Sequence, residues 1–213
     1  MSFLIKDYSG DNRKLMAYVS AVVIAAGESS RMGRFKPLLQ WNGLPMIEFQ
    51  ISSLFEAGVT EVVVVVGHNH ESITGNISSL DARYVINEYY RDGKTTSIKA
   101  GIASISPDCE EILLLAVDQP RPPEIIANII DSHLKNDALI TSPVYQDRGG
   151  HPIMFSSSLK PKLESITERS QGIREIFQSN SDAIHRIKID NPIIRLDLNN
   201  FETYQSAKLR YNA

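Results

Sequence analysis

A short segment near the start of the chain combines glycines, hydroxyls and cations at a spacing that suits an anionic ligand. It covers residues 25–36 and reads AAGESSRMGRFK. Gly27 and Gly33 permit a tight turn whose backbone amides can approach a ligand closely. The cations of the segment are Arg31, Arg34 and Lys36. Converging amides, hydroxyls and cations are typical of a polyphosphate site, and an ordinary polar loop with solvated cations is the alternative.

This segment differs from the two commonest phosphate-binding loops. A Walker A loop has four residues between its glycines, followed by Lys and then Ser or Thr. Here five residues separate Gly27 from Gly33, and Arg34 follows. The dinucleotide pattern G-x-G-x-x-G is also missing from the sequence. A P-loop ATPase and a classical NAD-dependent oxidoreductase are therefore disfavoured.

A second candidate for chemistry is Asp118, which follows the apolar run at residues 111–117. A carboxylate at the carboxyl end of a parallel strand projects over the edge of the sheet where ligands bind. Mg²⁺ takes one or two carboxylates together with phosphate oxygens and water. We therefore predict that Asp118 binds Mg²⁺, with capping of a helix begun by Pro122 as the alternative. Zinc is disfavoured, because the single cysteine and five scattered histidines form no ligand cluster.

The elements that must position these residues follow an alternating pattern. Continuous apolar runs predict strands buried on both faces, at residues 19–26, 61–66, 83–86, 111–117 and 138–144. Helical patterns lie between them, at residues 45–58, 94–105 and from 122 onward. This alternation predicts a three-layer α/β/α fold with a Rossmann-like, mostly parallel sheet.

After about residue 144 the alternation weakens. Gly149, Gly150 and Pro152 interrupt the chain. We expect short strands at 153–155 and 184–189, short helices at 160–166 and 172–178, and a terminal helix. Residues 1–17 are mixed in charge and read as a tail, so we predict a single domain over residues 18–213.

Composition restricts the class of protein. The 213 residues are 42% hydrophobic and 22% charged, which supports a packed core. The net charge of −3 gives no general basic field, so a nucleic-acid partner is not expected. No apolar run approaches the ~20 residues that a bilayer requires. With Cys109 as the only cysteine, we expect a cytoplasmic protein with no membrane partner.

The segment AAGESSRMGRFKPLL closely resembles the signature (L)AAGxSxRMGxxKxLL of the MobA-like nucleotidyltransferases. The resemblance implies the nucleotide-diphospho-sugar transferase type of fold and a loop that binds the triphosphate of an NTP. It implies catalytic roles for Arg31, Lys36 and Asp118, the last as a metal ligand. The nucleotide-binding residues that it implies are Ala25, Ala26, Gly27, Ser29, Ser30, Arg31, Gly33, Lys36 and Asp118.

Three further segments resemble motifs of the same family. RGGHP resembles the acceptor-side motif and implies that Gly150 and His151 contact the acceptor. NEYYRDGKTTSIKAGI implies a ligand contact for Ser97, whose alternative role is local helix chemistry. DLNNFETY resembles D-I-D-T-P-E-D-Y, in which the second Asp is a frequent metal ligand. That position is Asn199 here, either a neutral metal ligand or a helix N-cap.

The branch that these motifs resemble transfers CMP from CTP to molybdopterin and releases pyrophosphate. The guanylyl-transferring branch typically has Leu-Ala-Gly-Gly where this chain has Ala25, Ala26 and Gly27. We therefore expect CTP and molybdopterin as substrates, Mg²⁺ as cofactor and a molybdoenzyme as recipient. The alternatives are another NTP transferase, using GTP or a sugar-phosphate acceptor, and a non-catalytic molybdopterin carrier.

Overall fold

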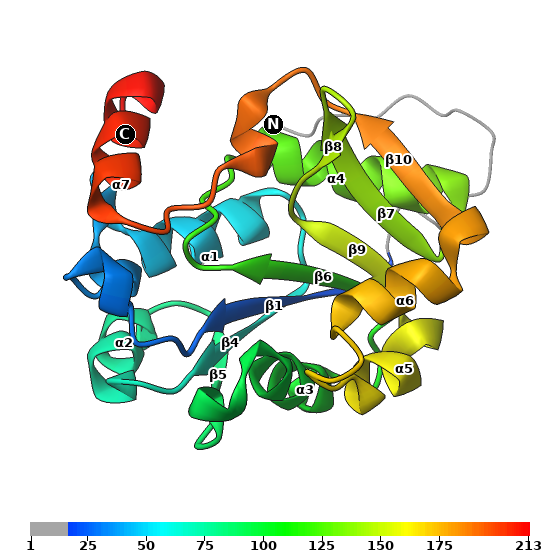
Figure 1. The fold of residues 1–213 in the computed structure, drawn as a ribbon, viewed down its shortest axis with the longest axis horizontal. Coiled ribbons are helices and arrows are strands. Elements are labelled where there is room, and N and C mark those ends of the chain that lie inside the picture. Colours follow the sequence, from blue (N-terminus) through cyan, green and yellow to red (C-terminus); the bar gives the residue numbers. More distant parts are fainter. Residues whose placement is uncertain (1–16) are drawn as a thin grey trace, which may run out of the picture.

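The apolar runs of the sequence form a central sheet that is covered by helices on both faces (Figure 1). The computed structural model describes residues 17–213. The predicted tail, apart from Ala17, lies outside the described residues. The arrangement confirms the expected three-layer α/β/α fold with a mostly parallel, Rossmann-like sheet.

The sheet has the strand order β10-β7-β9-β6-β1-β4-β5, with β8 paired to β7 at one side. Its strands are β1 (Val19–Ala25), β4 (Glu61–Val66), β5 (Arg83–Ile86), β6 (Glu111–Ala116), β7 (Ile140–Tyr145), β8 (Arg148–Gly149), β9 (Ile153–Ser156) and β10 (Ile184–Lys188). β9 runs antiparallel to both β6 and β7, and β8 runs antiparallel to β7. The strands β2 (Gln40–Trp41) and β3 (Leu44–Pro45) form a separate antiparallel pair.

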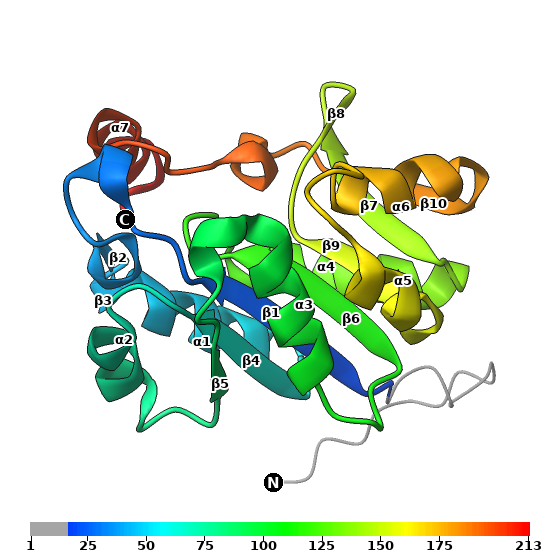
Figure 2. The same cartoon turned by 60° about the horizontal axis from the view of Figure 1, so that its bottom comes forward.

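The helices divide between the two faces of the sheet, as Figures 1 and 2 show. One face carries α1 (Met46–Glu56), α2 (His70–Ile77) and α4 (Pro123–Asn136), and the other carries α3 (Lys94–Ser104), α5 (Lys160–Ser165) and α6 (Ile173–Ser179). The terminal helix α7 (Phe201–Tyr211) adds Tyr204 and Ala207 to the core of the α1 side. Within residues 17–213, no helix combines the length and the apolar character needed to cross a bilayer.

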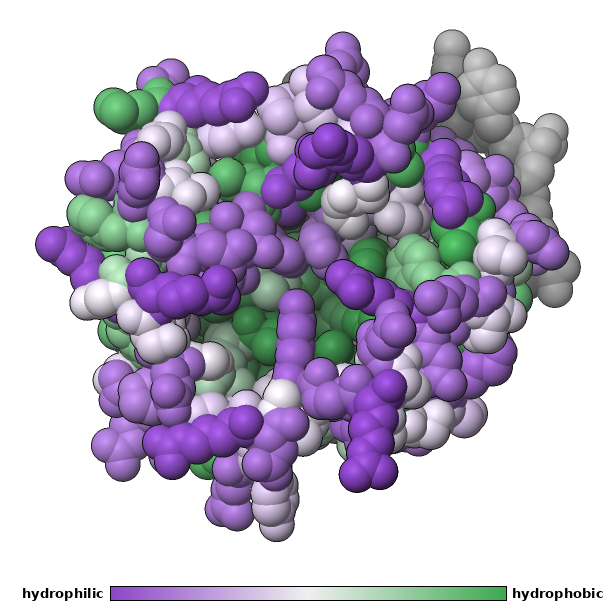
Figure 3. Space-filling view, viewed as in Figure 1, coloured by the Kyte–Doolittle hydropathy of each residue, from purple (hydrophilic) through white to green (hydrophobic). Residues whose placement is uncertain are grey.

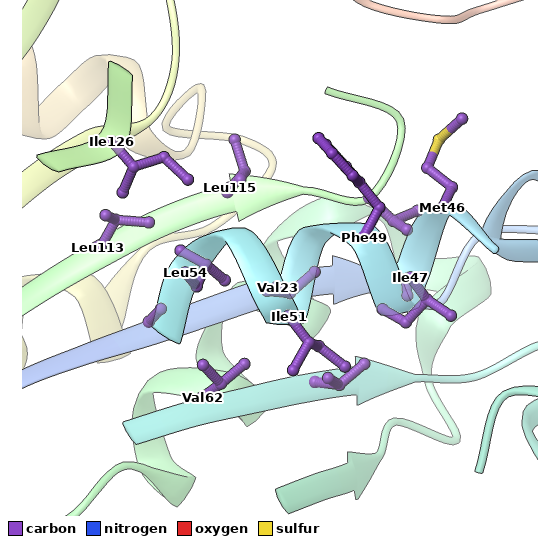
Figure 4. Packing of buried hydrophobic residues seen from close by; sticks show 14 of the residues in the cluster. Val23, Met46, Ile47, Phe49, Ile51, Leu54, Val62, Leu113, Leu115 and Ile126 are labelled. Atoms are coloured by element: carbon purple, nitrogen blue, oxygen red, sulfur yellow. The ribbon is translucent and has the colours of Figure 1, made fainter. Parts of the chain in front are cut away.

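Helix α1 packs across the middle of the sheet (Figure 4). Its Ile47, Ile51 and Leu54 are completely buried. They belong to one core cluster with Val23 of β1 and Leu113 of β6. Burying each such side chain contributes about 1.5–3 kcal/mol. This packing holds β1 and β6 side by side, so that their carboxyl ends open at the same edge of the sheet.

Helix α2 is the one regular helix of residues 17–213 that the sequence pattern did not predict. Its eight residues, HESITGNI, contain Ile73 and Ile77 as buried positions and include Gly75. Two apolar residues in two turns, together with a glycine, give too weak a helical pattern to recognise. Contacts with α1 stabilise the helix instead, and its Ile73 and Ile77 share a core cluster with Val62 and Val64 of β4.

Candidate active site

The candidate site lies where β1 and β6 end. Ile24 of β1 is in parallel register with Ala116 of β6, and the N–H of Val117 donates to the carbonyl of Ile24 at 3.0 Å. The segment that follows β1 therefore lies beside the segment that follows β6. This register brings together the two segments that the sequence singled out, residues 25–36 and Asp118. Parallel neighbouring strands require this, because their carboxyl ends lie at the same edge of the sheet.

The segment after β1 is a structured loop. Ser29 and Gly33 take left-handed backbone angles, with φ of 57° and 65°, on either side of one 3₁₀ turn at Ser30–Met32. The buried side chain of Met32 anchors the turn in the core. The N–H of Lys36 donates to Oγ of Ser29 at 3.1 Å, which closes the loop and sets the start of the next 3₁₀ turn. The loop thereby directs Lys36 toward β6.

Lys36 and Asp118 meet across this edge. Nζ of Lys36 lies 2.6 Å from Oδ2 of Asp118, and both side chains are only partly exposed, at 12% and 19%. An ion pair this close is stronger when water is partly excluded. The pair joins the two loops that the sequence singled out for phosphate and metal binding.

A buried amide holds the Asp118 loop in place. The side chain of Gln50 on α1 is completely buried, and its Nε2 donates to the carbonyls of Ala116 at 3.2 Å and Gln119 at 2.7 Å. Its Oε1 accepts the N–H of Arg121 at 3.3 Å. A glutamine within an amphipathic helix gives no signal of this role in the sequence, because nothing along the chain connects it to residues 116–121.

A cavity of about 290 Å³ opens beside the ion pair. Its lining includes Ile24, Ala25, Ala26, Gly27, Ser29, Lys36, Pro37, Tyr90, Gly93, Lys94, Ser97, Ala116, Val117 and Asp118. Six of the residues predicted to bind nucleotide are therefore together in one place. Ser97, predicted on the acceptor side, borders the same cavity and accepts a hydrogen bond from Nδ2 of Asn87 at 2.9 Å. We call this space the first cavity.

A second cavity of about 670 Å³ adjoins the first through Lys94, which lines both. Gly150 and His151 border it, together with Phe177 of α6. In Figure 3 the molecule is hollowed near the middle of the face shown, where hydrophobic residues are visible below a hydrophilic rim. Lys94, the first residue of α3, is a residue that sequence reasoning missed, although it lies inside the segment quoted for Ser97.

His151 is held as a neutral imidazole. Its pKa is lowered to about 4, chiefly because the ring is buried and further because Lys94 and Arg121 place positive charge nearby. A neutral ring can donate one hydrogen bond and accept another. His151 therefore offers polar contacts to a ligand in the second cavity without adding charge at neutral pH.

Comparison with known proteins identifies the family. The model of the MobA-like NTP transferase domain matches residues 21–184, which is most of the chain. The chain belongs to the MobA-like NTP transferase family. This confirms the resemblance found in residues 25–39 and the Rossmann-like nucleotidyltransferase type of fold.

Individual relatives of the chain are named for different activities. Nicotine blue oxidoreductase of Paenarthrobacter nicotinovorans is 29% identical over 165 residues, covering 73% of this chain and 79% of that protein. Molybdenum cofactor cytidylyltransferase of Escherichia coli (strain K12) is 28% identical over 198 residues, covering 92% of this chain and 98% of that protein.

Among solved structures, Rv0371c of Mycobacterium tuberculosis H37Rv superposes with a TM-score of 0.79 at 23% identity, covering 90% of this chain and 98% of that one. A complex of Rv0371c with manganese gives a TM-score of 0.74 at 21% identity and covers 89% and 97% of the two chains. At this identity the likeness supports the fold.

The remaining predicted site residues of the MobA-like domain lie farther from the first cavity. Arg31 is exposed and is not among the residues that line that cavity. Ser30 and Gly33 border a separate hollow, which Arg34 and His68 also line. Arg34, a cation of the same loop, lies over the ring of Phe201 at 4.6 Å from its centroid. Phosphate contacts for Ser30, Arg31 and Gly33 stay predictions.

The C-terminal motif places a second carboxylate, Asp197, near Asp118. The N-cap of α7 is Asn200, whose Oδ1 accepts the N–H of Thr203 at 2.8 Å, so Asn199 is not the cap. The N–H of Asn199 instead donates to the carbonyl of Asp197 at 3.0 Å. The pKa of Asp197 is raised because the carboxyl is partly buried and because Asp118 is close, against the opposing effect of Lys36 and Lys94.

This donor set fits a divalent cation of the hard, oxygen-binding kind. Oδ1 of Asp197 is buried and has no hydrogen-bond partner among the described residues. An orphaned carboxylate oxygen beside a second carboxylate is stabilised by a cation. Within residues 17–213, no three His, Cys, Asp or Glu side chains gather into a metal cluster. A cation here would therefore also need oxygens from a bound phosphate, as Mg²⁺ commonly does.

Proposed function

We propose that this MobA-like domain transfers CMP from CTP to the terminal phosphate of molybdopterin and releases pyrophosphate. The observation that carries the proposal is the Lys36–Asp118 ion pair at the edge of the first cavity, beside the loop of the family signature. A cytoplasmic location and transfer of the product to a molybdoenzyme belong to the same proposal.

The proposed reaction needs alignment and charge neutralisation more than proton transfer. An oxygen of the acceptor phosphate attacks the α-phosphorus of CTP and forms a new P–O bond. The bond between the α-phosphorus and the oxygen that bridges to the β-phosphate breaks, and pyrophosphate leaves with that electron pair. Because a phosphate acceptor is already anionic at neutral pH, no strong general base is required.

The residues that line the two cavities have different roles in the proposed reaction. In the first cavity, Lys36 neutralises charge on the leaving pyrophosphate, and Asp118 holds the divalent cation. The cation, proposed as Mg²⁺, supplies neutralisation of the triphosphate charge when bound. Lys94 lies at the junction of the two cavities and is placed to attract the phosphate of the acceptor. The Lys36–Asp118 pair is then the resting arrangement of two groups that separate to receive the nucleotide.

The wall of the first cavity supports a role for Ala26 in choosing the base. Ala26 is buried, and its Cβ and carbonyl lie so close to Gly67 that a Cβ there would approach them at 3.0 and 2.9 Å. The same added Cβ would lie 2.9 Å from the ring of Tyr90. Ala26 and Tyr90, which both line the first cavity, thus pack closely around Gly67. We propose that this tight packing limits the space beside the base.

The second cavity supports a bulky acceptor. It is more than twice as large as the first and combines apolar side chains with polar ones. Phe177 and Ile98 offer surfaces for a flat ring, and Gln171 and Gln178 offer amides that can pair with ring nitrogens and oxygens. These groups suit a polar heterocycle such as a pterin better than a small sugar.

The experiment that tests the proposal supplies each NTP in turn with Mg²⁺ and molybdopterin. We expect pyrophosphate release with CTP and a product whose mass equals molybdopterin plus CMP. Lys36→Ala is the inactive comparison, and Lys99→Ala, an exposed lysine on α3, is the matched control. Preference for GTP would contradict the argument from Ala26. Tight binding of molybdopterin without pyrophosphate release from any NTP would support a carrier instead.

A second candidate follows from the relative named nicotine blue oxidoreductase. An oxidoreductase reaction would consume NADH or NADPH, which absorbance at 340 nm measures directly. The site argues for the transferase, because the sequence lacks the G-x-G-x-x-G pattern of classical dinucleotide binding. We expect no oxidation of either nicotinamide cofactor in the presence of molybdopterin or of nicotine blue.

A further inference from the structure

Helix α3, whose first residue is Lys94, is capped by a carboxylate from a distant part of the chain. Its N-cap residue is Gly93, which has no side chain to accept the free amides of the first turn. The N–H of Thr95 donates instead to Oε1 of Glu168 at 2.8 Å, across 73 positions of the sequence. A carboxylate at a helix N-terminus gains from the helix dipole and from a charge-assisted hydrogen bond. Glu168 therefore attaches its own segment to the start of α3.

The backbone at Gly93 leaves room for this carboxylate. Gly93 has a φ of 121°, which favours glycine over residues with a Cβ. A Cβ at this position would collide with the side chain of Glu168. The glycine thus allows Glu168 to lie directly on the first turn of α3.

The turn that carries Glu168 has a shape fixed by its own backbone. The N–H of Gly172 donates to the carbonyl of Thr167 at 2.9 Å, and the N–H of Gln171 donates to the carbonyl of Glu168 at 3.2 Å. Gln171 and Gly172 both take positive φ angles, of 63° and 60°. We call residues 167–172 the tether turn. Because these bonds hold the turn together, fixing Glu168 on α3 fixes the whole turn.

The tether turn also touches α3 at a second point. A Cβ on Gly172 would lie 3.1 Å from Cγ2 of Thr95, so the two backbones pack closely there. Ile166 before the turn and Ile176 after it are buried in the core cluster of the α3 side. The turn is thus held at both ends by apolar packing and in between by the bond from Thr95 to Glu168.

The two segments that this bond joins both enclose the second cavity. Seven of the residues that line it lie within residues 168–178, and Lys94, Thr95 and Ile98 of α3 line it as well. No residue of 168–178 lines the first cavity. A change in the position of the tether turn therefore alters the second cavity and leaves the lining of the first in place.

We infer that Glu168 is a positioning residue for the acceptor, because it holds the tether turn and α6 at a fixed place relative to Lys94. The inference rests on the proposed nucleotidyl transfer and deepens it on the acceptor side. With its phosphate at Lys94 and its ring against Phe177, the acceptor extends across the joint that Glu168 closes. Glu168 acts through the backbone of Thr95 and touches no reacting atom.

Binding of molybdopterin by equilibrium dialysis, together with steady-state kinetics, tests the inference on the intact protein. We expect Glu168→Ala to raise the Kd and the KM for molybdopterin about tenfold, and to keep the KM for CTP within about twofold of the parent value. Glu168→Gln retains an oxygen that can accept the N–H of Thr95, so it should stay within about threefold of the parent. Glu164→Ala, an exposed carboxyl of α5, is the matched control.

The alternatives give different patterns in the same measurements. Equal increases in the KM for CTP and for molybdopterin would mean that Glu168 only supports α3, which overturns the inference. A Glu168→Gln variant as weak as Glu168→Ala would mean that the charge itself acts on the acceptor, and it would remove the positioning role. Unchanged molybdopterin binding in folded Glu168→Ala has the same consequence.

Trypsin provides a measurement on the unaltered protein, because Arg169 is exposed within the tether turn. We expect molybdopterin, and not CTP alone, to slow the cut after Arg169 at least about fivefold, since a ligand that spans the joint suppresses its opening. Glu168→Ala should be cut faster than Glu168→Gln, although both lack the acidic residue beside the cut bond.

Absence of protection by molybdopterin overturns the inference, while pyrophosphate release from CTP in the same preparation leaves the proposed function standing. Protection and Glu168-dependent binding without pyrophosphate release from any NTP give the opposite result. They retain the role of Glu168 in holding molybdopterin and remove the transferase.

Discussion

Nζ of Lys36 lies 2.6 Å from Oδ2 of Asp118, although 82 positions separate the two residues in the sequence. Each belongs to a motif that the sequence alone singled out, and the parallel register of β1 and β6 brings them together. The ion pair therefore connects the loop proposed to bind phosphate to the carboxylate proposed to bind the cation. Its existence makes the roles of the two residues testable by single substitutions.

We predict that Lys36→Ala and Asp118→Ala each reduce turnover at least about a hundredfold, because loss of one charge at a preorganised site costs on the order of 3 kcal/mol in the transition state. Both side chains are at the surface of a cavity, so the fold should persist. Pyrophosphate release and circular dichroism on the same samples provide the measurement. Full activity in either folded variant would exclude that residue from the mechanism.

The buried Gln50 gives a second prediction. Gln50→Ala leaves the carbonyls of Ala116 and Gln119 without their side-chain donor, and each unsatisfied buried group costs about 1–3 kcal/mol. We expect a loss of about 2 kcal/mol or more in unfolding free energy, together with lower turnover, because the Asp118 loop loses its attachment to α1. Urea denaturation and pyrophosphate release measure the two effects. The exposed Gln205→Ala is the control, and a Gln50→Ala variant of parental stability would contradict the prediction.

The sequence predicted most of the fold because buried parallel strands leave a strong signal. The run at residues 61–66 is β4 with the predicted boundaries, since five consecutive valines next to Glu61 fit only a strand covered on both faces. The antiparallel direction of β9 had no such signal, because four residues of β-propensity indicate a strand but not its direction.

The candidate site was predicted only where a residue belongs to a recognisable motif. Lys36 and Asp118 stand in such motifs, and both border the first cavity. Gln50 and Arg121 were missed because their roles depend on contacts between segments distant in the chain. Asp197 belongs to the C-terminal motif, but the resemblance assigned the metal contact of that motif to Asn199. Arg121 is completely buried and its guanidinium donates to four backbone carbonyls, yet such an arginine looks, in a sequence, like any surface arginine.

The buried Glu61 predicts how stability depends on pH. Glu61 accepts hydrogen bonds from Oγ of Ser20 at 2.6 Å and from the N–H of Ser106 at 2.9 Å, and it is paired with Arg83. Burial alone would raise its pKa, but these bonds outweigh burial and hold the pKa below its ordinary value. A carboxyl whose pKa is lower in the folded state stabilises the protein above the unfolded pKa of roughly 4.3 and loses this effect as pH falls through the folded value.

We therefore expect Glu61→Gln to lower the unfolding free energy by about 2 kcal/mol at pH 7. The difference from the parent should shrink as pH falls below about 4, where Glu61 itself becomes protonated. Urea denaturation at pH 7 and pH 3.5 measures both values. Glu56→Gln, an exposed carboxyl at the end of α1, should change neither. A difference that grows at low pH would show that the sign is wrong.

The imidazole of His151 yields the last prediction, which separates the two cavities. His151 borders the second cavity and is not among the residues that line the first. We expect His151→Ala to raise the KM for molybdopterin about tenfold, as loss of a polar contact worth about 1.4 kcal/mol would, and to leave the KM for CTP unchanged. His70→Ala, at the start of α2, is the control.

Because burial and nearby cations lower the pKa of His151 to about 4, its ring should stay neutral throughout the range in which an ordinary histidine titrates. Nuclear magnetic resonance of ¹⁵N-labelled imidazoles should therefore show no protonation of His151 between pH 6 and pH 8. The KM for molybdopterin should likewise lack a step from His151 in that range. A step near pH 6.5 that disappears in His151→Ala would mean that the ring is charged when the acceptor binds, which the buried and positively charged surroundings of His151 oppose.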